Sequence, residues 1–558
     1  MRLKQKRLLA SLLIIFTFIT FAHSGPASAF PWNGQDVSGP YDWPPYYGAS
    51  GIPGTSIQGY SFAIVDDFTH GGEDVSRLYP VPTPSNIDNA TFSCEGFADP
   101  TCVDKNSPDP NWQFIRILPP CKNGDSAESC IEGLQATDAS GVSRKLILDH
   151  IISNPLQWDG SVGRSLGIGS APSLWRDPAD SNPSDGYIVS VNGSGACGAN
   201  ANCTEIQNFS ASVSPYKTVM GNFGGNAVYT TSQGHKGFSG SAPPVCLWHE
   251  QGKCGLASNF TEVTQLELVL HLPKIISGWY MGRFIDPNIS IEAFDSNYYR
   301  LKILAKPASI PLVSAKVDVA NASDSQKQAF SNFFCSGGYC GGGMQSNNVA
   351  LAKYFDLFSN QLNNTAQLVK PTWSVRSVNS GFPCSQFGKV DGVVSTDATL
   401  YDGTPPAFEN GSMNYHVAAL HYLPDGSEFH GSYDLLMSST FARCLYKFTN
   451  APVSAKVEVV NSQGNTSIST STLTENAGWL HLSVNGFTFS NPTIQVKLLQ
   501  DAPAPIASPS PNSTSPAANS PTPSTKTASK VTIVCMKGKL TKKVSAIKPT
   551  CPMGYKKK

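Results

Sequence analysis

The chain has 558 residues, of which 40% are hydrophobic and only 14% are charged. Because single hydrophobic cores stop growing at roughly 250–300 residues, this length predicts two or three domains. The apolar content excludes a wholly disordered chain, since such chains lack the apolar surface that offsets the entropy of ordering. The 40 basic and 40 acidic residues cancel overall, but basic residues are concentrated at the two ends of the chain.

The first 29 residues have the pattern of an export signal. Basic residues at positions 2, 4, 6 and 7 precede an apolar run over residues 8–22, and Ala27-Ser28-Ala29 forms a small-residue cleavage site. The apolar run is shorter than the roughly 20 residues of a permanent membrane helix. We therefore expect a mature chain that starts at Phe30, is secreted or associated with the cell wall, and has no permanent membrane span.

An aromatic, proline-containing segment follows the expected cleavage site. It contains Trp32, Trp43, Tyr46 and Tyr47. Tryptophan and tyrosine present flat apolar faces with polar tips, which suit stacking on sugars or docking on other proteins. The alternative is an amino-terminal segment that packs these rings against the body, since such rings are highly buried on average.

The body of the chain has the residue pattern of β-strands. Leucine occupies every second position from Leu266 to Leu272, which is the period of a half-buried strand. Helical periods over residues 324–334 and 349–362 predict a helical insert near 324–362. We therefore expect a mainly β protein with two or more sandwich-like domains, a first β-rich region over residues 30–305 and a second over 306–500.

The fourteen cysteines predict a disulfide framework, because an even number in an exported chain indicates seven disulfides. No Cys-x-x-Cys spacing occurs and no histidine stands at zinc-finger spacing from a cysteine pair, so we expect neither a metal site nor a cofactor. Short loops close at the smallest entropic cost. The cysteines should therefore pair in chain order: Cys94 with Cys102, Cys121 with Cys130, Cys197 with Cys203, Cys246 with Cys254, Cys335 with Cys340, Cys384 with Cys444, and Cys535 with Cys551.

Two serine motifs raise the alternative of a secreted hydrolase. Gly163–Gly167 fits the G-x-S-x-G elbow of a serine nucleophile, but no clean buried strand precedes it. Ser239 stands in a segment similar to the serine loop of chymotrypsin-like proteases, and His70 with an acid such as Asp149 would complete a triad. Phe238 occupies the position where those proteases commonly carry aspartate. A non-enzymatic role is therefore preferred to a serine-dependent protease or esterase, or a glycan-active enzyme.

A spacer and a basic module end the sequence. Residues 502–525 contain seven prolines and no charge, which predicts a disordered linker over residues 501–528. The ten lysines from residue 526 onward have no acidic counterpart, whereas the body is acidic. This segregation predicts an anionic cell-envelope polymer, rather than nucleic acid, as the partner of the basic module at residues 529–558. The candidate contacts include Lys537, Lys539, Lys542 and Lys543.

The carboxy-terminal module has the layout of a small stapled hairpin. Lys537-Gly538 suits a turn between two short strands, and a disulfide would staple a unit too small to fold alone. With Cys535, Cys551 and the ending Cys-Pro-x-Gly-Tyr-Lys, the module resembles tails of exported proteins from high-GC Gram-positive bacteria. Body segments 278–283, 442–446 and 486–490 resemble exported proteins of uncharacterised function from the same bacteria. The resemblance implies delivery to the cell surface or retention there.

These features predict a secreted or cell-surface binding or adhesion protein of the bacterial envelope. A glycan or a protein is the expected ligand of the β-rich body, and an anionic polymer is the expected partner of the tail. The alternative function is that of a secreted hydrolase, which would need a cleft where catalytic groups converge.

Overall fold

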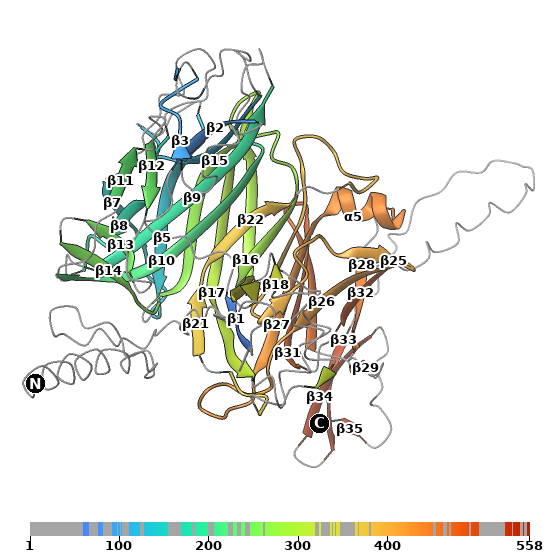
Figure 1. The fold of residues 1–558 in the computed structure, drawn as a ribbon. Helices are drawn as coiled ribbons and strands as arrows, with labels where there is room; N and C mark the ends of the chain where they lie inside the picture. The colour runs from blue at the N-terminus through green and yellow to red at the C-terminus, as the bar shows by residue number, and fades with distance from the viewer. Residues whose placement is uncertain are drawn as a thin grey trace, which may run out of the picture. The chain divides into compact units, whose positions relative to one another are not determined.

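The computed structural model divides the chain into two compact units, Met1–Asp501 and Ala502–Lys558 (Figure 1). Among the residues described, no helix combines the length and the apolar character needed to cross a membrane. The expected leader, the aromatic segment near Trp32 and the expected linker at 501–528 lie outside the described residues. The described residues are 60–65, 76–81, 92–97, 99–100, 102, 111–122, 128–153, 169–180, 185–198, 206–220, 227–230, 236–239, 246–250, 252–260, 263–317, 323–324, 335–336, 339–340, 342–345, 347, 363–366, 368–378, 381–449, 453–460, 466–467, 470–489, 493–500, 531–537, 540–546, 551 and 555–557.

One long sheet runs through the larger unit. Neighbouring strands in it are antiparallel, except for the parallel pair β16 and β23. In spatial order, its strands are β2 (Arg77–Val81), β4 (Asn111–Ile117), β9 (Asp185–Cys197), β10 (Asn208–Met220), β22 (Ser374–Val378), β16 (Gly278–Ala293), β23 (Val390–Thr396), β27 (His430–Ser438), β31 (Trp479–Thr488) and β30 (Thr470–Asn476).

A second sheet covers one part of this long sheet and forms a sandwich. The first core fills the space between them, with Phe114 and Val191 from the long sheet meeting Leu268 and Ile303 from the second. The strands of the second sheet are the carboxy-terminal half of β16, then β17 (Tyr298–Val317), β15 (Val263–Pro273), β5 (Cys130–Asp138) and β6 (Ser143–Lys145). The far half of β17 pairs with β21 (Leu368–Thr372) and with β1 (Tyr60–Val65), which also pairs with β20 (Gly342–Gln345).

A third sheet covers the other part of the long sheet and encloses the second core. Residues such as Leu435 and Leu482 from the long sheet meet Tyr415 and Val496 from the third sheet there. The sandwich-like β architecture expected from the sequence is therefore confirmed. The strands of the third sheet are β24 (Leu400–Tyr401), β26 (Ser412–Ala418), β32 (Thr493–Gln500), β28 (Val453–Val460) and β29 (Thr466–Ser467), with β25 (Ala407–Glu409) paired to β26.

Part of the long sheet curls back on itself. From β9 and β10 it continues to β8 (Ser173–Arg176) and β7 (Ile147–Ile151) on one side, and to β14 (Lys253–Ala257) and β13 (Cys246–Glu250) on the other. A small third core between these strands contains Leu174, Ile188, Tyr216, Leu247 and Trp248. The outermost strands, β7 and β13, are close enough for a hydrogen bond between His150 on β7 and Glu250 on β13.

Short elements complete the larger unit. The helix α5 (Ser439–Tyr446), which the sequence did not lead us to expect, follows β27 and packs Phe441 against Trp279 at a ring-centroid distance of 5.8 Å. The two helices expected near 324–362 lie outside the described residues except for Asp324, and the strands β18 to β20 lie between them. The remaining strands are β3 (Phe92–Ser93), β11 (Ala227–Thr230), β12 (Lys236–Ser239), β18 (Cys335–Ser336) and β19 (Tyr339–Cys340).

The disulfides follow the expected pairing wherever both cysteines are described with their side chains. The four bonds are Cys94–Cys102, Cys121–Cys130, Cys246–Cys254 and Cys384–Cys444. Cys335 and Cys340 face each other in the β18–β19 ladder, and Cys197 and Cys551 are also disulfide-bonded. No described cysteine is free.

The smaller unit contains the expected hairpin. Strands β33 (Val531–Lys537) and β34 (Leu540–Ala546) are antiparallel, with Lys537 opposite Leu540. The short strand β35 (Lys556–Lys557) pairs with β33.

Candidate functional site

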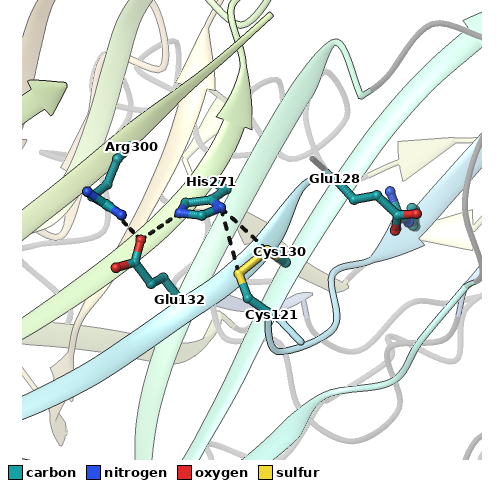
Figure 2. Close-up of a disulfide and its surroundings, with 7 residues drawn as sticks. Cys121, Glu128, Cys130, Glu132, His271 and Arg300 are labelled. Atoms are coloured by element: carbon teal, nitrogen blue, oxygen red, sulfur yellow. Dashed lines mark hydrogen bonds and ion pairs between the residues drawn. A yellow bond between two sulfur atoms is a disulfide. The ribbon is translucent and has the colours of Figure 1, made fainter. Parts of the chain in front are cut away.

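The second sheet carries a row of polar and reactive side chains across four neighbouring strands, and Figure 2 shows those on β5, β15 and β17. Cys130 on β5 lies opposite His271 on β15, His271 lies opposite Arg300 on β17, and Arg300 lies opposite Glu292 on β16. Directly opposed residues point to the same face of a sheet, so their side chains are neighbours. A register shift between β5 and β15 leaves Glu132 without a partner in the ladder, and its side chain joins this row.

His271 lies at the centre of the row and is fully buried. Its Nε2 is 2.6 Å from the Oε2 of Glu132, and the Nε of Arg300 donates to the same oxygen at 2.5 Å. On the other side of the ring, Nδ1 is 3.9 Å from the Sγ of Cys121 and 3.8 Å from the Sγ of Cys130. The imidazole therefore stands between a carboxylate and a disulfide.

The charges around the imidazole are fixed by hydrogen bonds. Burial acts to raise the pKa of Glu132, but hydrogen bonds from Arg300 and His271 outweigh it and hold the pKa below its usual value. Glu132 is therefore a carboxylate at neutral pH and accepts a hydrogen bond from the Nε2–H of His271. In the neutral ring this arrangement leaves the lone pair of Nδ1 directed at the two sulfurs.

This cluster combines groups suited to redox and metal chemistry. Cys121, Cys130 and His271 place three potential ligand atoms within 4.8 Å of one another. While the disulfide is intact its sulfurs are not thiolates, and thiolate is the form of cysteine that binds metals. In the oxidised chain the cluster is therefore a disulfide with a histidine packed against it, and Cys121 is partly exposed.

A second polar cluster joins the ends of the curled part of the sheet. His150 on β7 contacts Asp149 through Nδ1 at 2.7 Å and Glu250 on β13 through Nε2 at 3.0 Å. The other oxygen of Glu250 accepts hydrogen bonds from the backbone N–H and the hydroxyl of Ser153. Burial acts to raise the pKa of Glu250, but the bonds from Ser153 and His150 outweigh it and lower the pKa.

Large aliphatic side chains are exposed around this second cluster. All five residues of β7 are exposed, including Ile147, Leu148 and Ile151 with 39–41% of their surface accessible. Together with Val142 just before them, they are four of the eight large hydrophobic residues exposed in the described part of the chain. We use the name β7 patch for Ile147, Leu148, His150, Ile151 and Glu250.

Most of the sequence-predicted binding and catalytic residues fall outside what the structure describes. Trp32, Trp43, Tyr46, Tyr47, His70, Lys539 and the 163–167 motif lie outside the described residues. Ser239 ends β12, where its backbone pairs with Ala227. Asp149 contacts His150, so it already has an imidazole partner. The roles expected for all these residues stay predictions.

Three tail lysines can be placed on strands of the smaller unit. Lys537 ends β33, while Lys542 and Lys543 lie on β34 opposite Cys535 and Val534. Sequence reasoning missed His271, Glu132 and Arg300. The only signal was a histidine within the leucine alternation of residues 266–272.

None of three comparisons, with protein-family models, with curated proteins and with solved structures, finds a significant match to this chain.

Proposed function

We propose that the protein is a secreted or cell-surface binding protein of the bacterial envelope, and that its body binds its partner through the β7 patch. The observation that carries this proposal is the concentration of exposed aliphatic side chains on one strand. Contiguous exposed apolar surface is uncommon on soluble proteins and marks interaction sites. Ile147, Leu148 and Ile151 are exposed within five residues of one strand, and Leu148 and Ile151 lie opposite Trp175 and Ser173, on one face of it.

The polar side chains of the patch favour binding over catalysis. Both nitrogens of His150 are engaged by carboxylates, and Ser153 donates to Glu250. A serine nucleophile needs its hydroxyl against the imidazole that takes its proton. The cluster is instead a fixed set of hydrogen-bonding groups beside apolar surface, which is the usual composition of a binding site. The hydrolase alternative stays a prediction tied to Ser239 and His70.

The test is a binding measurement on the mature full chain with cell-wall fragments, a glycan array and surface proteins of the producing cell. We compare Ile151→Ser with Leu499→Ser, because both side chains are 41% exposed and only Ile151 belongs to the patch. Burying an isoleucine contributes on the order of 1.5 kcal/mol, so Ile151→Ser should weaken binding by about tenfold. Leu499→Ser should bind like the unmodified chain.

Measuring at high salt distinguishes binding by the body from binding by the tail in this assay. At about 1 M salt the Debye length falls to about 3 Å, so attraction by the tail lysines is screened while apolar contacts persist. Equal binding by the two variants at high salt would exclude the β7 patch as the site. Turnover of protein, ester or glycan substrates by the purified chain would favour the hydrolase instead.

A further inference from the structure

We propose that the cluster around His271 becomes a metal site when the Cys121–Cys130 disulfide is reduced. The ligands are the Sγ atoms of Cys121 and Cys130 and the Nδ1 of His271, and the cation is a thiophilic divalent ion such as Zn²⁺. This site is distinct from the β7 patch and does not depend on the proposed binding function.

The atoms already have nearly the spacing that a tetrahedral metal needs. Zinc binds thiolate at about 2.3 Å and imidazole at about 2.0 Å, which places sulfur and nitrogen ligands about 3.5 Å apart at a tetrahedral angle. Nδ1 of His271 is 3.9 Å and 3.8 Å from the two sulfurs. Only the two sulfurs have to move apart, and reduction of the bond between them allows this.

The surroundings of the imidazole are those of a metal-binding histidine. Such histidines commonly donate their second N–H to a carboxylate, which fixes the tautomer and raises the basicity of the ligand nitrogen. Glu132 is in this position at 2.6 Å, and Arg300 holds Glu132. Phe294 packs beside the ring at a centroid distance of 4.3 Å. His271 is thus oriented before any cation arrives.

The intact disulfide gives Nδ1 of His271 only long contacts with sulfur, at 3.9 Å and 3.8 Å. Disulfide sulfur carries no proton, so when Nε2 holds the ring proton the two sulfurs cannot donate a hydrogen bond to Nδ1. A thiol of Cys121 or Cys130 could donate one, and a bound cation could take the Nδ1 lone pair. Glu128, a carboxylate of the same loop, pairs with Arg116 at 3.2 Å and points away from the imidazole (Figure 2), so it is not among the proposed ligands.

The conversion needs a dithiol as reductant. One thiolate of the dithiol attacks the partly exposed Sγ of Cys121, the S–S bond breaks, and Cys130 leaves as a thiolate beside His271. The second thiol of the reagent then displaces Cys121, so the dithiol loses two electrons and becomes a cyclic disulfide while the protein gains two thiols. Binding of Zn²⁺ releases the two thiol protons to water.

Another disulfide provides an internal comparison. Cys94 and Cys102 are buried, and the carboxylate of Asp99 lies 3.8 Å from the Sγ of Cys102. This group also brings three potential ligands together, but it offers a carboxylate in place of an imidazole. Carboxylate is a harder ligand and less suited to a thiophilic cation, so Cys94 and Cys102 should retain the cation less well.

The experiment is site-resolved alkylation of the full chain after reduction by dithiothreitol and anaerobic removal of the reagent. Iodoacetamide is applied with and without Zn²⁺, and mass spectrometry reports each cysteine separately. We expect Zn²⁺ to protect Cys121 and Cys130 more than Cys94 and Cys102. His271→Ala should abolish this protection, Glu132→Gln should weaken Zn²⁺ affinity at this pair by about tenfold or more, and the control His150→Ala should leave it unchanged.

A second variant covers the case in which the reduced chain loses its fold, as reported by circular dichroism. Cys121→Ser leaves Cys130 as a thiol beside His271 without any reductant, so the other disulfides stay formed. It should bind one equivalent of Co²⁺ with a thiolate-to-metal absorption band, and Cys121→Ser with His271→Ala should not. The proposal is overturned if protection at Cys121 and Cys130 persists without His271, if it is absent from the folded reduced chain, or if Cys121→Ser binds no Co²⁺.

Discussion

Asp397 in the second core should make the stability of the protein depend on pH. Its carboxyl group is fully buried, and burial raises its pKa from 3.8 to about 7. Hydrogen bonds from Ser432 and the positive charge of Arg283 oppose this effect without cancelling it. The backbone N–H of Ser432 donates to Oδ1 of Asp397 at 2.8 Å, and the guanidinium of Arg283 bonds the carbonyls of Thr396 and Ala398 on either side.

The sign and the size of the effect follow from the two pKa values. A carboxyl group with a raised pKa holds its proton more tightly in the folded chain than in the unfolded chain. Its contribution to stability is therefore fully present below pH 3.8 and is lost as the pH rises to about 7. At about 1.4 kcal/mol for each pKa unit the whole effect is about 4 kcal/mol, of which about 2.5 kcal/mol falls between pH 5 and pH 8.

Asp397→Asn tests this reasoning because asparagine does not titrate and can still accept the Ser432 hydrogen bond. The assay is urea-induced unfolding of the disulfide-intact chain from pH 5 to pH 8, followed by tryptophan fluorescence. The unmodified chain should lose about 2.5 kcal/mol of unfolding free energy relative to Asp397→Asn over this range. Asp425→Asn is the control, since hydrogen bonds from Ser427 lower the pKa of Asp425 and place its titration below pH 5. Parallel pH curves for the unmodified chain and Asp397→Asn would refute the argument.

Two further predictions concern the tail and the disulfides. Deleting residues 526–558 removes the uncompensated lysines and should release the protein from the cell surface into the medium, as measured by immunoblotting of cell and medium fractions; unchanged retention would contradict the proposed role of the tail. Replacing Cys384 and Cys444 by alanine opens a loop with a separation of 60 residues and should cost about 4 kcal/mol in urea unfolding, whereas replacing Cys94 and Cys102, with a separation of 8, should cost about 2.5 kcal/mol. Equal losses from the two pairs would show that loop entropy does not set the effect.

Short-range sequence patterns predicted the parts of the fold that depend mainly on residues close together in the chain. The alternating leucines between Leu266 and Leu272 form β15, and all four are buried in the first core. The four disulfides described are those expected from chain order. The two strands expected on either side of Lys537-Gly538 are present and pair antiparallel as β33 and β34. In most of these cases the signal and its cause lie within a few residues or within one short loop, whereas Cys384–Cys444, with a separation of 60 residues, follows from chain order alone.

The His271 cluster could not be predicted because it depends on strand register. The side-chain period of two shows which residues share a face of one strand, but it does not show which residue of another strand lies opposite. His271 meets Cys130 across a separation of 141 residues and Glu132 across 139. The unpaired position of Glu132 also comes from a register shift between two strands, which neither strand shows on its own.

The division of residues 30–500 into domains was difficult to predict from the sequence, because β16 contributes side chains to two cores. Trp279 and Met281 pack in the second core, whereas Tyr280 and Phe284 pack in the first. A strand that is buried on both faces has no alternation of polar and apolar residues to mark an exposed side. Gly392 shows how closely the shared sheet is packed, since a Cβ there would lie 2.5 Å from the ring of Trp279. The boundary expected between residues 305 and 306 falls inside β17, which runs unbroken from Tyr298 to Val317. A chain cut at that boundary would divide β17, whose first half pairs with β15 and β16 and whose second half pairs with β1 and β21.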